Sequence, residues 1–444
     1  MISRSLTCGA IAACVITTLA LSGHGASART GPPALVGSIT EMGPNGSTAL
    51  TAQTMDLAKK FEQLYPGTSV RVTIVPYDQY EQKLALLFAS GQAPDIFFAT
   101  GSILRYVQEG KILPLDHYIA SDPTLTNPAK TRTWSYNMVK YDNQHIYATQ
   151  NGSLCSMQFY YNRDLFAKAH VPVPTDNWTW QDVLSAAKKL TIRQGNNTVQ
   201  WGIDLGYQGW DGGWQSIAAS NGATNIISPI FNPRHVNLTQ PGVVQTWQFL
   251  QDLIYKYKVA PPPSVSTALA GSSAGSFTTG KVAMVPDGCW QMSSYQQAIK
   301  HLGMAMMPKG TAGRVSPVWQ ANAEVISSSS KNKALAWAFL RWSQVSPAAN
   351  AIMSRGGLNC GVPTVIAFDN LYASSWRGIP GGNACVDSLT HKTGFWQVTG
   401  PNWNKISDTI ITPQWQNFLQ GKMTAQQLAA KLEPQVNAAL ASGQ

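Results

Sequence analysis

The residues that follow the N-terminal apolar run alternate between strand-like and helix-like patterns, and this alternation limits the fold more than any other feature. Residues 35–39 read as a short strand and residues 49–65 as a helix with one apolar stripe. Apolar residues then alternate over 70–74, a second helix follows, and residues 96–99 form the next buried strand. Strand, helix, strand, helix, strand predicts an α/β lobe with a doubly wound parallel sheet.

Two loops of this lobe are candidate ligand sites. In doubly wound sheets, ligands bind beyond the carboxyl ends of the strands. The loops at those ends are 45–47 and 100–102, so Ser47 and Ser102 are candidate contacts.

Asp78 and Glu81 are spaced as a capping box for the second helix.

Later segments continue the mixture of strands and helices. Residues 178–190 read as a helix with one apolar face, after a proline-rich link that follows a strand. Residues 243–257 and 424–440 also read as helices, whereas 261–279 is rich in small residues and reads as a loop or a weak helix.

Residues 1–28 have the composition of a secretory signal peptide. Arg4 precedes an apolar run over 6–21, and Ala26-Ser27-Ala28 is a cleavage motif. The run is too short for a comfortable membrane span of about 20 residues. We therefore expect an exported protein in the periplasm or on the extracellular face of the membrane. A weak lipoprotein pattern that ends at Cys14 leaves a lipid anchor open.

Four cysteines follow the signal, namely Cys155, Cys289, Cys360 and Cys385. An even number in an exported chain favours disulfide bonds. Cys360 and Cys385 lie in a Gly/Pro-rich stretch and would close a loop of about 25 residues, so we expect this bond, with Cys155–Cys289 as the second. The sequence has no Cys/His cluster at metal-ligand spacing, and we expect neither a metal nor another cofactor.

The formal charge of +10 raises the question of nucleic-acid binding. Only 12% of the residues are charged, and the longest basic runs are the pairs Lys59-Lys60 and Lys188-Lys189. A nucleic-acid interface normally gathers its basic residues on one face or in a recognised module. We therefore expect no nucleic-acid partner.

Seven segments, in order along the chain, resemble the bacterial extracellular solute-binding proteins, the sugar-binding components of ABC importers of the maltose and multiple-sugar type. The segments are LAKKFEQLYPG at 57–67, APDIFFATG at 93–101, LPLD at 113–116, YNRDLF at 161–166, FTTGKVAMVPDGCW at 277–290, SKNKALAWAFLRWSQ at 330–344 and GGLNCGVP at 356–363.

The resemblance implies a two-lobed α/β periplasmic-binding-protein fold, with a ligand cleft between lobes joined by a hinge. It places the N-terminal lobe at 29–150 plus 316–360 and the C-terminal lobe at 151–315 plus 361–444. It also implies a monomer that binds a sugar or oligosaccharide without turnover and delivers it to the permease of an ABC transporter.

The resemblance also points to ligand contacts in the second lobe. Trp290 stands where sugar-binding relatives often present a stacking aromatic residue, and Asp287 on the same loop could accept a ligand hydroxyl or cap a helix. Trp210 and Asp211 lie in a Gly-rich run at the implied cleft edge. Packed tryptophans in a tight turn are the alternative for that run.

Further polar residues stand where the implied lobes are joined. They are Gln150 and Asn151 at the first crossing, Trp319, Gln320 and Asn322 at the return crossing, and Asn359 in the Gly-rich loop. At each position a hinge hydrogen bond competes with ligand contact.

The sequence offers little support for an enzymatic function. Residues 271–275 match the nucleophile pattern G-x-S-x-G, but they lie in a Ser/Ala/Gly tract and not between a strand and a helix. A glycosidase needs two carboxylates at a defined separation, which the sequence alone does not exclude. The nearer alternative keeps the fold and replaces the sugar by a glycerol phosphodiester or another polar metabolite.

Overall fold

The structure is a computed structural model. It describes residues 35–45, 48–99, 103–150, 154–205, 213–270, 275–320, 323–355, 361–374, 376–390, 393–395, 398, 400 and 402–442. The expected signal peptide lies outside these ranges. Among the helices within them, none is both long and apolar enough to cross a membrane.

The first sheet has five strands in the order β2-β1-β3-β13-β4. β1 (Gly37–Asn45) pairs in parallel with β2 (Thr68–Pro76) and β3 (Ile96–Phe98). β13 (Ala323–Ile326) pairs antiparallel with β3 and with β4 (Ala148–Gln150). The predicted parallel arrangement of the first three strands is confirmed, and a strand from far along the chain completes the sheet.

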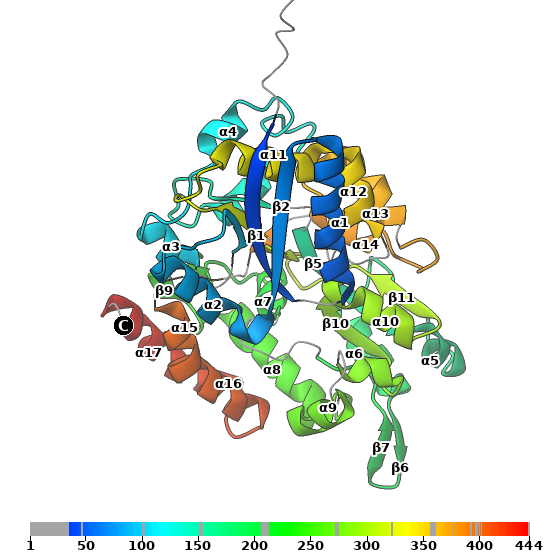
Figure 1. Cartoon of the computed structure of the whole chain (residues 1–444). Coiled ribbons are helices and arrows are strands. Elements are labelled where there is room, and N and C mark those ends of the chain that lie inside the picture. The colour runs from blue at the N-terminus through cyan, green and yellow to red at the C-terminus, as the bar shows by residue number, and fades with distance from the viewer. Residues whose placement is uncertain are drawn as a thin grey trace, which may run out of the picture. The chain divides into compact units, whose positions relative to one another are not determined.

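Helices from the N-terminal part of the chain and from residues 333–353 lie around this sheet (Figure 1). They are α1 (Thr48–Leu64), α2 (Tyr77–Ala89), α3 (Ile103–Gln108), α4 (Asp116–Ala120), α11 (Lys333–Val345) and α12 (Pro347–Met353). The buried ring of Phe61 on α1 lies 5.1 Å from that of Phe339 and 5.4 Å from that of Trp342, both on α11. These aromatic contacts hold α1 and α11 together, although the two helices lie far apart in the sequence.

The capping box predicted at the start of α2 is wrong. The N-cap of α2 is Pro76, and no side chain caps the helix. Strand β2 runs directly into α2 at Pro76, so Asp78 lies inside the first helical turn instead of before it. At that position a carboxylate can still favour the helix electrostatically, because helix N-termini carry partial positive charge.

The second sheet is built around β5 (Leu154–Asn162), whose nine residues are all buried. β10 (Met284–Gly288), β11 (Leu302–Ala305) and β12 (Ser316–Gln320) pair antiparallel with β5. β14 (Thr393–Phe395) pairs in parallel with β12. Residues 316–320, which the family resemblance places in the first lobe, pair with strands of the second sheet.

An aromatic cluster fills the core beside the second sheet. Trp214 of α7 (Trp214–Ser220), Trp247 of α8 (Pro241–Tyr255) and Trp415 of α16 (Thr412–Leu419) have ring centroids 5.0–6.1 Å apart. The C-terminal helix α17 (Ala425–Ala441), red in Figure 1, packs against α8 and α16. The predicted helix at 424–440 is confirmed, and its role in packing is confirmed with it.

The other elements connect these layers. They are η1 (Thr133–Val139), α5 (Arg163–Lys168), α6 (Trp180–Leu190), β6 (Ile192–Gln194), β7 (Asn197–Gln200), β8 (Ile227–Ser228), β9 (His235–Val236), α9 (Pro263–Ala270), η2 (Ser276–Thr279), η3 (Cys289–Gln291), α10 (Met292–Ala298), η5 (Ile366–Phe368), α13 (Asp369–Ser374), α14 (Ala384–Asp387), η6 (Ser388–Thr390), α15 (Trp403–Ile406) and η7 (Ser407–Ile411).

Candidate functional site

The chain passes between the two sheets at two points that strand pairing brings together. β4 ends at Gln150 and β5 begins at Leu154, whereas β12 ends at Gln320 and β13 begins at Ala323. Gln150 pairs with Ala323 in the first sheet, and Leu154 pairs with Gln320 in the second. Two strands therefore leave one sheet and enter the other side by side, which is the arrangement of a hinge.

The structure describes only some of the residues that are predicted to contact ligand at the crossings. The backbones of Gln150, Trp319 and Gln320 lie at the crossings, on β4 and β12. Asn151 and Asn322 lie outside the described residues, as do Ser47, Ser102, Trp210, Asp211, Asn359 and Cys360. Strand pairing thus places the backbones of Gln150 and Gln320 at adjacent crossings. All of these ligand contacts remain predictions.

Trp214 ends the Gly-rich run that contains Trp210 and Asp211, and it is a core residue. It begins α7, is 2% exposed, and lies in the aromatic cluster with Trp247 and Trp415. Gly213, just before it, has a φ of 77°, a left-handed conformation that glycine adopts without strain. The run therefore ends on a firmly packed helix.

Asp287 lies at the end of β10, three residues before Trp290. Its side chain is 5% exposed, and both carboxylate oxygens accept hydrogen bonds. The Tyr295 hydroxyl donates to Oδ2 at 2.5 Å and the Gly288 N–H donates to Oδ1 at 2.7 Å. Burial raises the pKa of Asp287 to about 6, and nearby Asp204 also raises it, whereas the two hydrogen bonds lower it.

Asp204 is a functional candidate that the sequence analysis missed. It is 1% exposed, and its Oδ2 accepts hydrogen bonds from Ser266 of α9, at 2.6 Å, and from Ser276 of η2. A Cβ at Gly202 would overlap the backbone of Ala187 on α6, so only glycine lets the segment before Asp204 lie this close to α6. No short motif marks Asp204, because its partners come from 62 and 72 residues further along the chain.

A second pair of carboxyl groups lies in the first sheet. Glu41 of β1 is 5% exposed, and burial, then the charge of Glu324 on β13, then a hydrogen bond with Glu324, raise its pKa well above the ordinary range. The Oε2 atom of Glu41 and the Oγ1 atom of Thr149 are buried without a hydrogen-bond partner among the described residues. Thr149 stands directly opposite Glu324 in the sheet, one residue from the first crossing.

These buried polar groups are unusual, because most buried polar atoms in proteins have a partner. Two carboxyl groups share a hydrogen bond only when one of them carries a proton, which agrees with the raised pKa of Glu41. Both carboxyl pairs, Glu41 with Glu324 and Asp204 with Asp287, lie close in sequence to segments that the resemblance places at the cleft.

The predicted Cys155–Cys289 bond is not confirmed, since no disulfide joins these two residues. Successive residues of a strand point to opposite faces of a sheet. Cys155 therefore shares a face of β5 with Met157 and Phe159, whereas Cys289 lies near Tyr160, on the other face. The predicted Cys360–Cys385 bond is untested because Cys360 lies outside the described residues.

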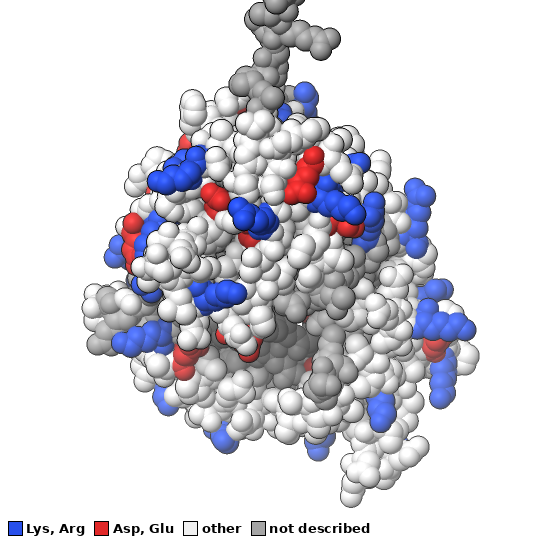
Figure 2. All heavy atoms as spheres, viewed as in Figure 1, with Lys and Arg blue, Asp and Glu red and all other residues white. Residues whose placement is uncertain are grey.

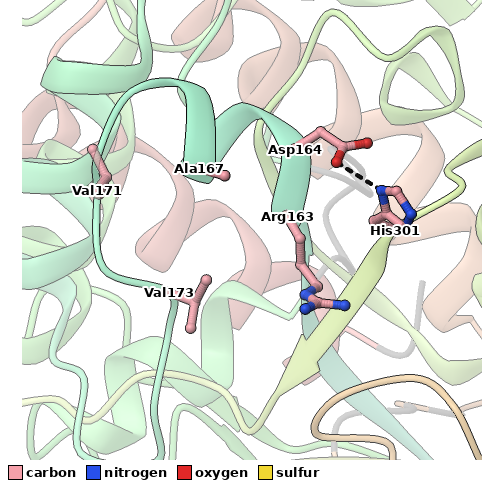
Figure 3. A pocket seen from close by; sticks show the side chains of 6 residues that line it. All are labelled: Arg163, Asp164, Ala167, Val171, Val173 and His301. Atoms are coloured by element: carbon pink, nitrogen blue, oxygen red, sulfur yellow. Dashed lines mark hydrogen bonds and ion pairs between the residues drawn. The ribbon is translucent and has the colours of Figure 1, made fainter.

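A surface pocket of about 420 Å³ lies at the opposite end of β5 from the crossings (Figure 3). Arg163, Asp164 and Ala167 of α5 line it, with Val171, Val173 and His301. Nδ1 of His301 lies 2.7 Å from Oδ1 of Asp164, and both side chains are about half exposed. Such exposed pairs contribute little stability. None of the predicted ligand contacts lines this pocket.

Neither the charge on the face shown in Figure 2 nor the metal-ligand chemistry of the described residues gives a second candidate. Lys and Arg are scattered among Asp and Glu on the face shown in Figure 2. Groups of three or more His, Cys, Asp or Glu side chains that could hold a metal ion are absent from the described residues.

Comparisons with known proteins connect the fold to a family. The family model for bacterial extracellular solute-binding proteins matches residues 45–349. A protein of Brucella abortus (strain 2308), provisionally named a binding protein, is 23% identical over 302 residues, which cover 64% of this chain and 66% of that protein. The match thus spans about two thirds of the relative's length.

Solved structures show the same fold. An ABC substrate-binding protein from Listeria monocytogenes, solved in complex with cycloalternan, has a TM-score of 0.75 and 24% identity, covering 91% of this chain and 99% of that one. The cyclic alpha-maltosyl-1,6-maltose binding protein from Arthrobacter globiformis has a TM-score of 0.73 and 17% identity, covering 92% and 100%. The chain therefore has the two-lobed α/β fold of periplasmic solute-binding proteins, as the sequence analysis expected.

Proposed function

Because the chain belongs to the bacterial extracellular solute-binding protein family, we propose that it binds a sugar or oligosaccharide for an ABC importer. The observation that carries the proposal is the family match over residues 45–349, which includes both crossings between the sheets. The names of the two structural relatives support the ligand class, since one was solved with cycloalternan and the other is a maltosyl-maltose binding protein.

The ligand would lie between the two sheets, at the edges where the crossings start. Sugars present an apolar C–H face and a ring of hydroxyl groups, so their sites combine aromatic surfaces with hydrogen-bonding side chains. Trp290 would supply the stacking surface. Gln150, Gln320 and the polar residues near them would bind hydroxyl groups from the crossings.

The remaining parts of the proposal follow from the family. The protein would be exported by the segment 1–28, would act as a monomer, and would deliver its ligand to the permease subunits of the transporter. Closure of the two lobes around the ligand would be the state that the permease recognises, so the ligand must favour the closed form.

The proposal is tested by a thermal-shift screen against monosaccharides, disaccharides and oligosaccharides, with glycerol phosphodiesters as the comparison class. A saccharide that binds the folded state raises the melting temperature by mass action. A shift with a saccharide and none with the phosphodiesters supports the proposal. A shift with the phosphodiesters alone would replace the sugar by an anionic ligand, and loss of intact saccharide in proportion to protein and time would indicate a hydrolase.

A further inference from the structure

The turn that carries Trp290 is held by an unusual set of buried hydrogen bonds. β10 ends at Gly288, and η3 (Cys289–Gln291) and α10 follow directly. The N–H of Gly288 donates to Asp287 at 2.7 Å, and the carbonyl of Gly288 accepts from the Tyr160 hydroxyl at 3.1 Å. Both backbone polar groups of Gly288 are thus fixed by side chains, two residues before Trp290.

Tyr295 closes this arrangement from the other side of the turn. Its hydroxyl donates to Asp287 at 2.5 Å, and its ring centroid lies 5.0 Å from that of Tyr160 and 4.9 Å from that of Phe277. All three rings are at most 1% exposed. We call Asp287, Gly288, Tyr160 and Tyr295 the Gly288 clamp. Because both tyrosines are buried, neither hydroxyl has solvent water beside it to replace a lost partner.

Asp287 is the group in the clamp whose charge changes near neutral pH. The groups that face the clamp are Asp204 from the loop after β7, Tyr295 from α10 and Tyr160 from β5, with Cys289 and Cys385 beside Tyr160. Burial and the charge of Asp204 raise the pKa of Asp287 to about 6. The hydroxyl of Tyr295 stays protonated over this range, because burial and Asp287 raise its pKa further.

We propose that Asp287 is a positioning residue, whose carboxylate form holds the Trp290 turn in the geometry that binds ligand, so that binding weakens in acid. The carboxylate accepts from Tyr295 and from Gly288 at once. In the protonated form, the oxygen that carries the proton becomes a donor and is a weaker acceptor than a carboxylate oxygen. Protonation therefore releases one anchor of the clamp, and the turn loses its fixed position.

The first test needs no ligand. The protein is labelled with 5-fluorotryptophan, and the ¹⁹F resonance that is missing from Trp290→Phe is followed from pH 5.0 to 7.5. We expect this resonance to move with a midpoint near pH 6 in the wild-type protein. Asp287→Asn should abolish the movement. Asp164→Asn is the control, because it removes an exposed carboxylate on α5, the helix that follows β5. This variant should leave the midpoint unchanged.

Two further variants keep the test decisive if Asp287→Asn does not fold. Asp204→Asn removes the charge that raises the pKa of Asp287, so the midpoint should move down. Tyr295→Phe removes a hydrogen bond that lowers this pKa, so the midpoint should move up. An unmoved midpoint in both variants, or a resonance that does not titrate in the wild-type protein, would overturn the proposal.

The second test rests on the proposed function and uses cycloalternan, maltotriose and mannotriose as probes in calorimetric titrations. At pH 5.0 about one molecule in eleven carries an ionised Asp287, so a saccharide that requires this form should bind about tenfold more weakly than at pH 7.5. Asp287→Asn should show no such dependence. Equal affinity at both pH values in the wild-type protein would overturn the positioning role. If no probe binds at any pH, the proposed function loses its support, and the ¹⁹F titration still decides the clamp.

Discussion

The aromatic cluster of the second core gives a sharp prediction about stability. Trp247 is fully buried on α8, and its ring contacts those of Trp214, Trp415 and Phe418 at centroid distances of 5.0, 5.8 and 6.3 Å. Truncation of a buried Phe or Trp to Ala costs about 3–5 kcal/mol. We expect Trp247→Ala to lie in the upper half of this range, because aromatic pairs add about 0.5–1.5 kcal/mol beyond area burial. A domain is stable by only about 5–15 kcal/mol, so one substitution removes a large share.

The assay is urea unfolding without ligand, in which circular dichroism monitors the loss of structure. Tyr77→Ala is the matched control, because Tyr77 is an aromatic residue with 67% of its surface exposed, and its truncation should change stability by less than about 0.5 kcal/mol. The cluster also anchors α7, which begins at the end of the Gly-rich run that contains Trp210 and Asp211. A loss below about 1 kcal/mol for Trp247→Ala would show that this core does not hold the second sheet's helices as we argue.

Three further predictions concern other parts of the chain. Glu41→Gln should match the wild-type protein in stability near pH 4 and exceed it increasingly as pH rises, because above the ordinary pKa of 4.5 this carboxyl ionises in the unfolded chain but keeps its proton when buried in the folded chain, which favours unfolding of the wild-type protein; parallel urea midpoints at every pH would contradict this. Arg132→Lys should lower the free energy of unfolding in urea by about 1–3 kcal/mol, because Arg132 donates to both oxygens of Asp369 at 2.7–2.8 Å and to the Pro363 carbonyl. An unchanged urea midpoint would refute the role of this bidentate pair. Mass spectrometry of unreduced peptides should find Cys360 linked to Cys385, and free thiols at both positions would reject the bond.

Local patterns predicted the elements whose structure depends on nearby residues. The strands and helices of residues 35–99 follow from alternation and from one apolar stripe in each helix. The helix expected at 178–190 begins instead at Trp180, because Thr179 and Asp182 form a capping box that the sequence analysis did not identify. The capping box expected at Asp78 failed, because the strand before α2 continues to Pro76 and leaves no residue free to act as a side-chain cap.

Contacts between residues far apart in the chain could not be predicted from the sequence. β13 enters the first sheet between β3 and β4, and this brings Glu324 to Glu41, a residue 283 positions earlier in the chain. Asp204 meets Ser276 and Asp287 in a similar way. No period or motif within one segment encodes such meetings, so both carboxyl pairs were missed. Asp287 was expected to accept a hydrogen bond from a ligand hydroxyl, but its two oxygens already accept hydrogen bonds from Gly288 and Tyr295.

The most direct measurement is calorimetric titration of the protein with a panel of purified saccharides, followed by chromatography of the ligand recovered from each titration. Our interpretation predicts saturable binding of at least one saccharide at a single site, with the ligand recovered chemically intact. Trp290→Ala should weaken this binding by about 2 kcal/mol or more, the scale of an aromatic hot spot, without a comparable loss of stability in the absence of ligand. Absence of saccharide binding across the panel, or recovery of cleaved saccharide, would contradict the claim that this chain is a sugar-binding protein.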